Sequence, residues 1–226
     1  MEKNRDIKLV LVTVLAVGIV GLSIGFAAFS NVLRISTAAN VTPDEGTFNV
    51  DFSATATEVN DNDIVPEVSS STLLDYEPAV SLSATNAKID NTADPTIKNL
   101  NATFFAPGQK AVYKFYAYNA GELDAYLKSI VFENATGQTS NKVCTAGQGA
   151  NNTLVQKACE GIVVKVKVGD EAETTSSMAS ITNHQLLKSA SEPITVTIEY
   201  LAGSAAADGD FTVSFGDIAL TYSSAE

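Results

Sequence analysis

The chain has 226 residues, of which 45% are hydrophobic and 18% charged, and its 26 acidic and 14 basic side chains give a formal net charge of −12. This excess of negative charge excludes binding to nucleic acid or to anionic lipid through the overall electrostatic field. The length is sufficient for one domain with a substantial core.

The first residues have the pattern of an export leader. Three basic residues precede an uncharged, mostly apolar run over residues 9–29, which ends in small residues. Gly25 and Ala27 occupy the two small-residue positions of a signal peptidase site if the cut falls between Ala27 and Ala28. Because about 20 apolar residues cross a bilayer, the same run is also long enough for an uncleaved membrane anchor.

Both interpretations divide the chain in the same way. We expect residues 1–27 to be the signal peptide or anchor, residues 28–45 an N-terminal extension, and residues 46–226 a folded domain. Both place that domain outside the cytoplasm, either secreted or at the cell surface. The membrane is then contacted only through residues 9–29, and only if the leader is not cleaved.

Beyond the leader, apolar residues recur at every second position, which is typical of strands with one buried and one solvated face. We therefore predict strands over residues 48–52, 79–84, 96–105, 111–118, 126–132, 162–168, 194–200 and 211–222. In the last of these the apolar parity changes from odd to even across Gly216 and Asp217, so a β-bulge is expected there.

Turn residues separate the predicted strands, for example Pro107-Gly108. About eight strands connected by turns predict an all-β fold, an antiparallel β-sandwich or jelly roll. Thr182–Lys188 is interpreted as one short helix with Thr182 as its N-cap. Residues 58–74, rich in Asn, Asp and Ser, are interpreted as an exposed loop.

The two cysteines, Cys144 and Cys159, are expected to form one disulfide, because paired cysteines in an exported chain usually do. The bond would close a polar loop that has too few apolar residues to pack a core. For a loop of about 15 residues the chain-entropy model gives a stabilisation near 3 kcal/mol. The alternative, a redox or metal-binding pair, matches neither the C-x-x-C spacing nor a zinc pattern.

Catalytic motifs are missing from the sequence. His184 is the only histidine, and neither H-E-x-x-H, nor G-x-S-x-G, nor a Gly-rich phosphate loop occurs. We therefore expect no enzymatic activity and no cofactor, and interpret His184 as a polar residue of a helix or loop. Asp61, Asp63 and Glu67 form either a solvated acidic loop or a weak Ca²⁺ site without EF-hand spacing.

Several segments resemble one family. Residues 25–31, GFAAFSN, form a leader junction, and residues 46–50, GTFNV, resemble a first strand. Residues 99–123 contain a strand, a Pro-Gly-polar turn, an aromatic strand and an Asn-x-Gly-x-Leu turn, and residues 211–222 resemble a closing strand. This order of motifs is similar to that of the TasA/camelysin (CalY) family, exported fibre proteins of the biofilm matrix of Gram-positive bacteria.

The resemblance implies a jelly-roll domain that is exported, processed by a dedicated signal peptidase, and assembled head-to-tail into extracellular fibres. In such fibres the N-terminal segment of each subunit adds a strand to the next. Camelysin has been described as a protease, but this chain lacks ligands for that chemistry, so the activity is not carried over.

The candidate donor strand lies between residues 28 and 41. Phe29, Leu33 and Ile35 share odd parity, an imperfect two-residue period of the kind that sets register in strand addition. The apolar residues expected to mediate assembly are Ala28, Phe29, Val32, Leu33, Ile35 and Val41. The alternatives are that the segment is a tether or an intramolecular strand, and that the protein is a monomeric, membrane-anchored surface adhesin or binding module.

Overall fold

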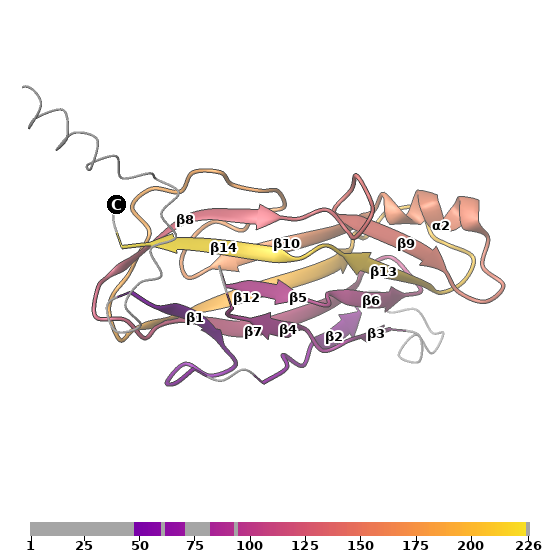
Figure 1. Ribbon diagram of the computed structural model, residues 1–226. Coiled ribbons are helices and arrows are strands. Elements are labelled where there is room, and N and C mark those ends of the chain that lie inside the picture. The colour runs from indigo at the N-terminus through magenta and orange to yellow at the C-terminus, as the bar shows by residue number, and fades with distance from the viewer. Residues whose placement is uncertain (1–47, 60–61, 71–81, 93–94, 225–226) are drawn as a thin grey trace, which may run out of the picture. The chain divides into compact units, whose positions relative to one another are not determined.

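The computed structural model describes residues 48–59, 62–70, 82–92 and 95–224 (Figure 1). The leader and the candidate donor strand lie outside the described residues. The described part is antiparallel β-structure with one short helix, which confirms the all-β class. No helix within it is long and apolar enough to cross a membrane.

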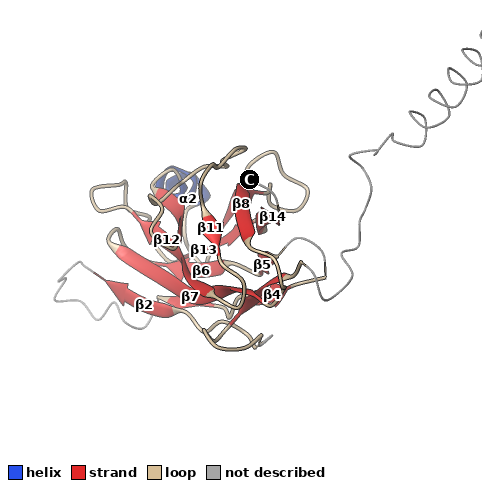
Figure 2. Cartoon of the chain, turned by 90° about the vertical axis from the view of Figure 1, so that its left-hand side faces the viewer, coloured by secondary structure: helices blue, strands red, loops and turns tan. Residues whose placement is uncertain are grey.

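The elements follow one another as β1 (Val50–Ser53), β2 (Glu67–Ser70), β3 (Ser83–Ala84), β4 (Lys88–Asp90), β5 (Thr96–Lys98), β6 (Asn101–Phe104), β7 (Gln109–Asn119), β8 (Ala125–Phe132), β9 (Lys142–Ala146), α2 (Asn152–Cys159), β10 (Ile162–Val168), β11 (Gln185–Leu186), β12 (Ser191–Tyr200), β13 (Phe211–Phe215) and β14 (Ile218–Ser223). All the predicted strands have counterparts here, although 79–81 lie outside the described residues. The strands are arranged in two layers (Figure 2).

The first layer is the sheet β1-β7-β12-β10. The long strand β7 is its centre: β12 pairs with one edge, while β1 and β2 lie end to end along the other. Strand β10 forms the far edge of this sheet, next to β12.

The second layer consists of two sheets that run into one another, β11-β8-β14-β5-β4 and β3-β6-β13-β9. They are joined along the chain where β5 passes into β6 and where β13 passes into β14. The second junction is Gly216-Asp217, and the buried side chains change from odd to even parity across it. The parity therefore changes at the predicted position, but the chain there passes from one strand to another in a different sheet, so the expected β-bulge is wrong. The irregularity in strand pairing lies further on, between Thr221 and Tyr222.

Aromatic side chains connect the two layers. The ring of Tyr200 from β12 packs edge-on against Phe104 of β6 and Phe211 of β13, with ring centroids 6.0 and 5.6 Å apart. Tyr113 of β7 is fully buried, and its hydroxyl donates to the carbonyl of Thr85 at 3.0 Å. Offset and edge-on ring pairs of this kind add about 0.5–1.5 kcal/mol each beyond the burial of apolar area.

Two further sequence predictions are wrong. Thr182–Lys188 is not a helix: Asn183 has a left-handed φ of 63°, which interrupts a helix, and Gln185–Leu186 form β11 on the edge of β8. The only helix in the described residues is α2, in the segment between the cysteines. There Val155, Ala158 and Cys159 supply one buried face, so the segment does contribute to the core.

Residues 58–74 are also not wholly a loop. Within them Glu67–Ser70 form β2, which pairs with Gln109–Val112 of β7, while all four of its side chains remain exposed. The polar composition indicated exposure correctly but could not reveal a strand, because an edge strand without a buried face lacks the alternating pattern.

Gly216 allows the close approach of two chain segments. A Cβ added there would overlap the carbonyl oxygen of Glu133 and lie 2.7 Å from the carbonyl carbon of Asn134. We therefore expect Gly216→Ala to lower the free energy of unfolding by about 1–3 kcal/mol, the usual range for overpacking. Gly209→Ala is the control, since its Cβ would meet only Ala150, with the nearest atom, the Ala150 Cβ, at 3.1 Å. Equal urea midpoints for the two variants would contradict the close approach.

Candidate functional site

The edges of the two layers are the places where this protein could pair with another chain, because unpaired strand edges present free N–H and C=O groups. The edges of β9, β1, β10 and β8 each have a segment or side chain that covers them.

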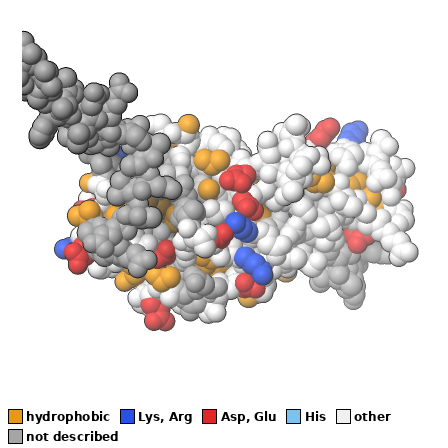
Figure 3. Space-filling model, in the orientation of Figure 1, with side chains coloured by type: hydrophobic (Ala, Val, Ile, Leu, Met, Phe, Trp, Pro, Cys, Tyr) orange, Lys and Arg blue, Asp and Glu red, His pale blue; other side chains and the backbone are white. Residues whose placement is uncertain are grey.

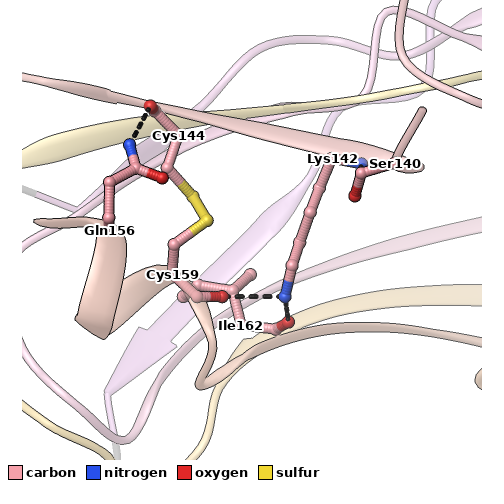
Figure 4. Close-up of a disulfide and its surroundings, with 6 residues drawn as sticks. All are labelled: Ser140, Lys142, Cys144, Gln156, Cys159 and Ile162. Carbon is pink, nitrogen blue, oxygen red and sulfur yellow. Dashed lines mark hydrogen bonds between the residues drawn. A yellow bond between two sulfur atoms is a disulfide. The ribbon is translucent and has the colours of Figure 1, made fainter. Parts of the chain in front are cut away.

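Helix α2 covers the outer edge of β9 (Figure 4). Cys144 of β9 and Cys159 of α2 form a disulfide with their Cα atoms 6.1 Å apart, in agreement with the pairing expected from the sequence. The Gln156 side-chain amide donates to the Cys144 carbonyl at 3.2 Å. The helix begins after Asn151, whose side-chain oxygen accepts from the backbone N–H groups of Thr153 and Leu154.

Lys142, at the start of β9, secures the other end of α2. Its ammonium group donates to the backbone carbonyls of Cys159, at 2.7 Å, and of Ile162. Burial lowers the pKa of Lys142, and the charge of Glu160 opposes this. The lysine thus caps carbonyls at the helix C-terminus, a position that favours a cation.

On the opposite side of the sandwich, a side chain replaces a strand. Asn91 accepts from the backbone N–H of Phe52 at 2.8 Å and donates to its carbonyl at 3.0 Å, so it completes the outer edge of β1. Close by, Ile64 and Ala87 exchange two backbone hydrogen bonds, of 2.9 and 3.0 Å. These contacts join the first layer to the second along this side.

A single segment lies along both β10 and β8, and we call residues 172–183 the flap. Thr174 exchanges two backbone hydrogen bonds, both of 2.8 Å, with Val166 of β10 in the first layer. Met178 exchanges bonds of 2.8 and 3.0 Å with Ile130 of β8 in the second layer, and Ile181 donates to the Lys128 carbonyl. In Figure 1 the segment that connects β10 with β12 passes alongside β8.

The base of the flap is closed by a cluster of four side chains, Glu171, His184, Glu192 and Tyr222, which we call the clasp. His184 bonds through Nδ1 to a carboxylate oxygen of Glu171 at 2.9 Å and through Nε2 to Glu192 at 2.6 Å. The Tyr222 hydroxyl donates to the second oxygen of Glu192 at 2.9 Å. Glu192 lies in β12 of the first layer and Tyr222 in β14 of the second, so the clasp links both layers.

The clasp favours the charged imidazole. The side chains of His184 and Glu192 are only 10% and 11% exposed. The hydrogen bond to Glu192 raises the pKa of His184 to about 9, with a smaller contribution from Glu171 and against the effect of burial. Burial also raises the pKa of Tyr222, and the neighbouring charge of Glu192 adds to this. When the imidazole is protonated, each of its two ring N–H groups donates a hydrogen bond to one of the two carboxylates.

Gly169 makes room for the clasp. Its φ is +50°, and an added Cβ would lie 2.9 Å from the Glu192 carboxylate oxygen that binds His184. The glycine is therefore required both by its left-handed conformation and by the close approach of the carboxylate.

The other candidate site residues predicted from the sequence lie outside the clasp. Asp63 is exposed and Glu67 pairs with Lys114 at 2.8 Å, while Asp61 lies outside the described residues. No group of three or more His, Cys, Asp or Glu within the described ranges could hold a metal ion. Ala28, Phe29, Val32, Leu33, Ile35 and Val41 lie outside the described residues.

The sequence did contain one signal for the clasp. Apolar residues of β12 point into the core at even positions from 194 to 200, and Glu192 continues this parity. A carboxylate in a core-facing position requires a partner, because burying an unpaired charge is costly. The sequence pattern did not identify that partner, because His184 lies outside β12 and Tyr222 belongs to another strand.

Comparison with known protein families, with characterised proteins and with solved structures gives no match to this chain.

The disulfide should stabilise the domain. We expect the Cys144→Ser/Cys159→Ser variant to lose about 3 kcal/mol of unfolding free energy, because the reduced chain no longer has its loop of about 15 residues closed in the unfolded state. Urea unfolding monitored by circular dichroism measures the loss. Treatment of the unaltered protein with a reductant should give the same value, and an unchanged midpoint in both experiments would contradict the prediction.

The clasp should make stability dependent on alkaline pH. The pKa of His184 is about 9 in the folded protein and about 6.5 when unfolded. A raised pKa gives stabilisation that is complete below pH 6.5 and lost as the pH rises through 9. We expect His184→Gln to cost about 3 kcal/mol at pH 6, from the size of the pKa shift, and much less at pH 10. A stability difference between the two proteins that stays constant over this range would contradict the role of the imidazolium.

Proposed function

We propose that the chain is a structural subunit of an extracellular fibre, of the biofilm-matrix or pilus-like kind, assembled by donation of an N-terminal strand to the next subunit. The proposal includes membership of the TasA/camelysin family and a jelly-roll arrangement of the sandwich. Export is supported by the leader pattern and by the Cys144–Cys159 disulfide, a bond that persists in oxidising compartments.

The observation that carries the proposal is the position of the Asn-x-Gly-x-Leu turn. The N–H of Gly121 donates to the carbonyl of Asn49 at 3.1 Å, and an added Cβ at Gly121 would lie 2.6 Å from the Asn49 nitrogen. This family-like turn therefore holds the chain where the N-terminal extension joins the domain. A fixed exit point is what a subunit needs in order to direct its extension toward a neighbour.

Within residues 99–123, the segment that resembles the TasA/camelysin family, polar side chains stabilise the turns. Asn119 is fully buried, accepts from the N–H of Gly121 and donates to the carbonyl of Leu123 at 2.8 Å. Gln109 is also fully buried and accepts from the N–H groups of Phe105 and Ala106 across the Pro-Gly turn. Both residues thus have definite structural reasons to stand at these positions in such a fold.

The surface is compatible with a structural role. On the face drawn in Figure 3, acidic and basic side chains lie next to one another near the middle, without a broad area of one sign. In the clasp, both ring nitrogens of His184 and both carboxylate oxygens of Glu192 are engaged in hydrogen bonds.

Filament formation by the exported protein tests the proposal. Burying a Leu side chain contributes roughly 1.5–3 kcal/mol, so Leu33→Asp should lose at least that much at every junction. Electron microscopy should show filaments for the unaltered protein and only soluble β-rich monomers for this variant. Ser36→Asp is the matched control, because it introduces the same charge at the opposite parity, and it should retain filaments.

The outcomes distinguish the alternatives. Filaments formed by Leu33→Asp, or by a variant without residues 28–41, would contradict strand donation. A full-length species that remains in the membrane fraction as monodisperse particles would instead favour the anchored adhesin or binding module, for which the length of the apolar run over residues 9–29 is the specific evidence.

A further inference from the structure

Strand β10 has a sheet edge that is only partly covered. Val166 bonds to Thr174 through both its N–H and its C=O, whereas the N–H of Gly169 bonds to Pro193 on the side of β12. Hydrogen-bonding direction alternates along an antiparallel strand. The N–H and C=O of Val164 therefore point away from β12, toward the edge, and none of the described residues bonds to them there.

Three of the other edges are covered more completely. Helix α2 is fixed over β9 by a disulfide, Asn91 occupies both edge groups of Phe52 in β1, and β8 is bonded by β11 as well as by Met178 and Ile181. Strand β10 has seven residues, and the backbone of the flap bonds to it only at Val166. On either side, Lys142 bonds to the Ile162 carbonyl and the N–H of Glu171 to the Val168 carbonyl, so the open position lies at Val164. Among these four edges, that of β10 would accept a further strand with the smallest rearrangement.

Between its ends the flap is held by hydrogen bonds, at Thr174, Ser177 and Met178, but not by buried side chains. Residues 175–180 are all exposed, and the first side chain of the flap to be buried is that of Ile181. Segments with few buried apolar contacts and solvent-exposed hydrogen bonds open at the lowest free energy. The contact between Glu171 and His184 closes the base of the flap, since these two residues flank it on either side.

We propose that the outer edge of β10 is the acceptor for the strand donated by a second copy of this chain, and that the flap, closed by the Glu171–His184 contact, controls access to it. The inference rests on the proposed function and names the acceptor that strand donation requires. The occupant is residues 28–41 of the second copy, a segment longer than β10.

The chemistry of the edge fits this occupant. The side chains of Ile162, Val164, Val166 and Val168 are buried and point into the core. A strand added beside them would turn alternate side chains toward the same core, at the side of the sandwich that the flap now closes. The odd-parity apolar residues Phe29, Leu33 and Ile35 are of the type that such a position buries.

Val164→Pro tests the acceptor edge. Proline lacks the backbone N–H, and at this position the N–H points away from β12. The hydrogen bonds between β10 and β12 are therefore kept. A strand added at the outer edge would lose one hydrogen-bond donor and would clash with the proline ring. We expect a folded monomer that forms no filaments and does not elongate seeds of the unaltered protein. Filaments as abundant as those of the unaltered protein would overturn the proposal and leave the proposed function standing.

The matched control is Val68→Pro in β2. The even residues of β7 bond toward β2, where Val112 faces Glu67 and Lys110 faces Ser69, so the N–H of Val68 also points away from its partner strand. This variant should form filaments at the normal rate. Loss of filaments in Val68→Pro but not in Val164→Pro would assign the acceptor role to β2.

A second pair of variants tests the flap. This test can be made even if Val164→Pro fails to fold. Glu171→Ala removes the contact that closes the flap. Glu173→Ala removes a carboxylate of the flap whose ion pair with Lys165 is long, at 3.9 Å. We expect Glu171→Ala to shorten the lag of filament formation several-fold and Glu173→Ala to leave it unchanged. An unchanged or longer lag for Glu171→Ala would overturn the control by the flap. Failure of the unaltered protein to form filaments would overturn the proposed function and, with it, this acceptor.

Discussion

The requirement that backbone N–H and C=O groups at sheet edges find partners determines the architecture of this protein. A sandwich of two open layers has four lateral edges, and each unpaired edge is a site for uncontrolled pairing with another chain. Here the edges of β9, β1, β8 and β10 are covered by four different means: a disulfide-bonded helix, an asparagine side chain, a short two-residue strand, and a flap. The elements that looked like irregular connections in the sequence are the ones that perform this task.

The clasp shows how a buried charge can hold a segment that covers sheet edges. Glu192 is only 8% exposed, which would be costly for a lone carboxylate, but it accepts from His184 and from Tyr222. His184 in turn reaches Glu171 at the other end of the flap. The net contribution of such a cluster to stability is smaller than its pairwise attractions, because desolvation opposes them, but the geometry ties a surface segment to both layers at once.

Much of the fold could be predicted from the sequence because strands with one buried face carry a periodic signal. The change of parity across Gly216 marked the passage from β13 to β14, and the cysteine parity indicated the disulfide. The failures have a common cause. Helix α2 buries only three residues, β2 buries none, and the flap pairs through single residues, so none of them produces a period that a sequence pattern could show. The clasp depends on contacts between distant residues, of which only Glu192 had a signal in its parity.

The central claim is that strand β10 is the edge through which one subunit receives a strand from another. The most direct measurement is backbone hydrogen–deuterium exchange compared between the monomer and the filament. The account predicts that amides of Ile162–Val168 become more protected in the filament while those of residues 172–183 become less protected. Added protection confined to Glu67–Ser70, or an unchanged exchange pattern along β10, would contradict it.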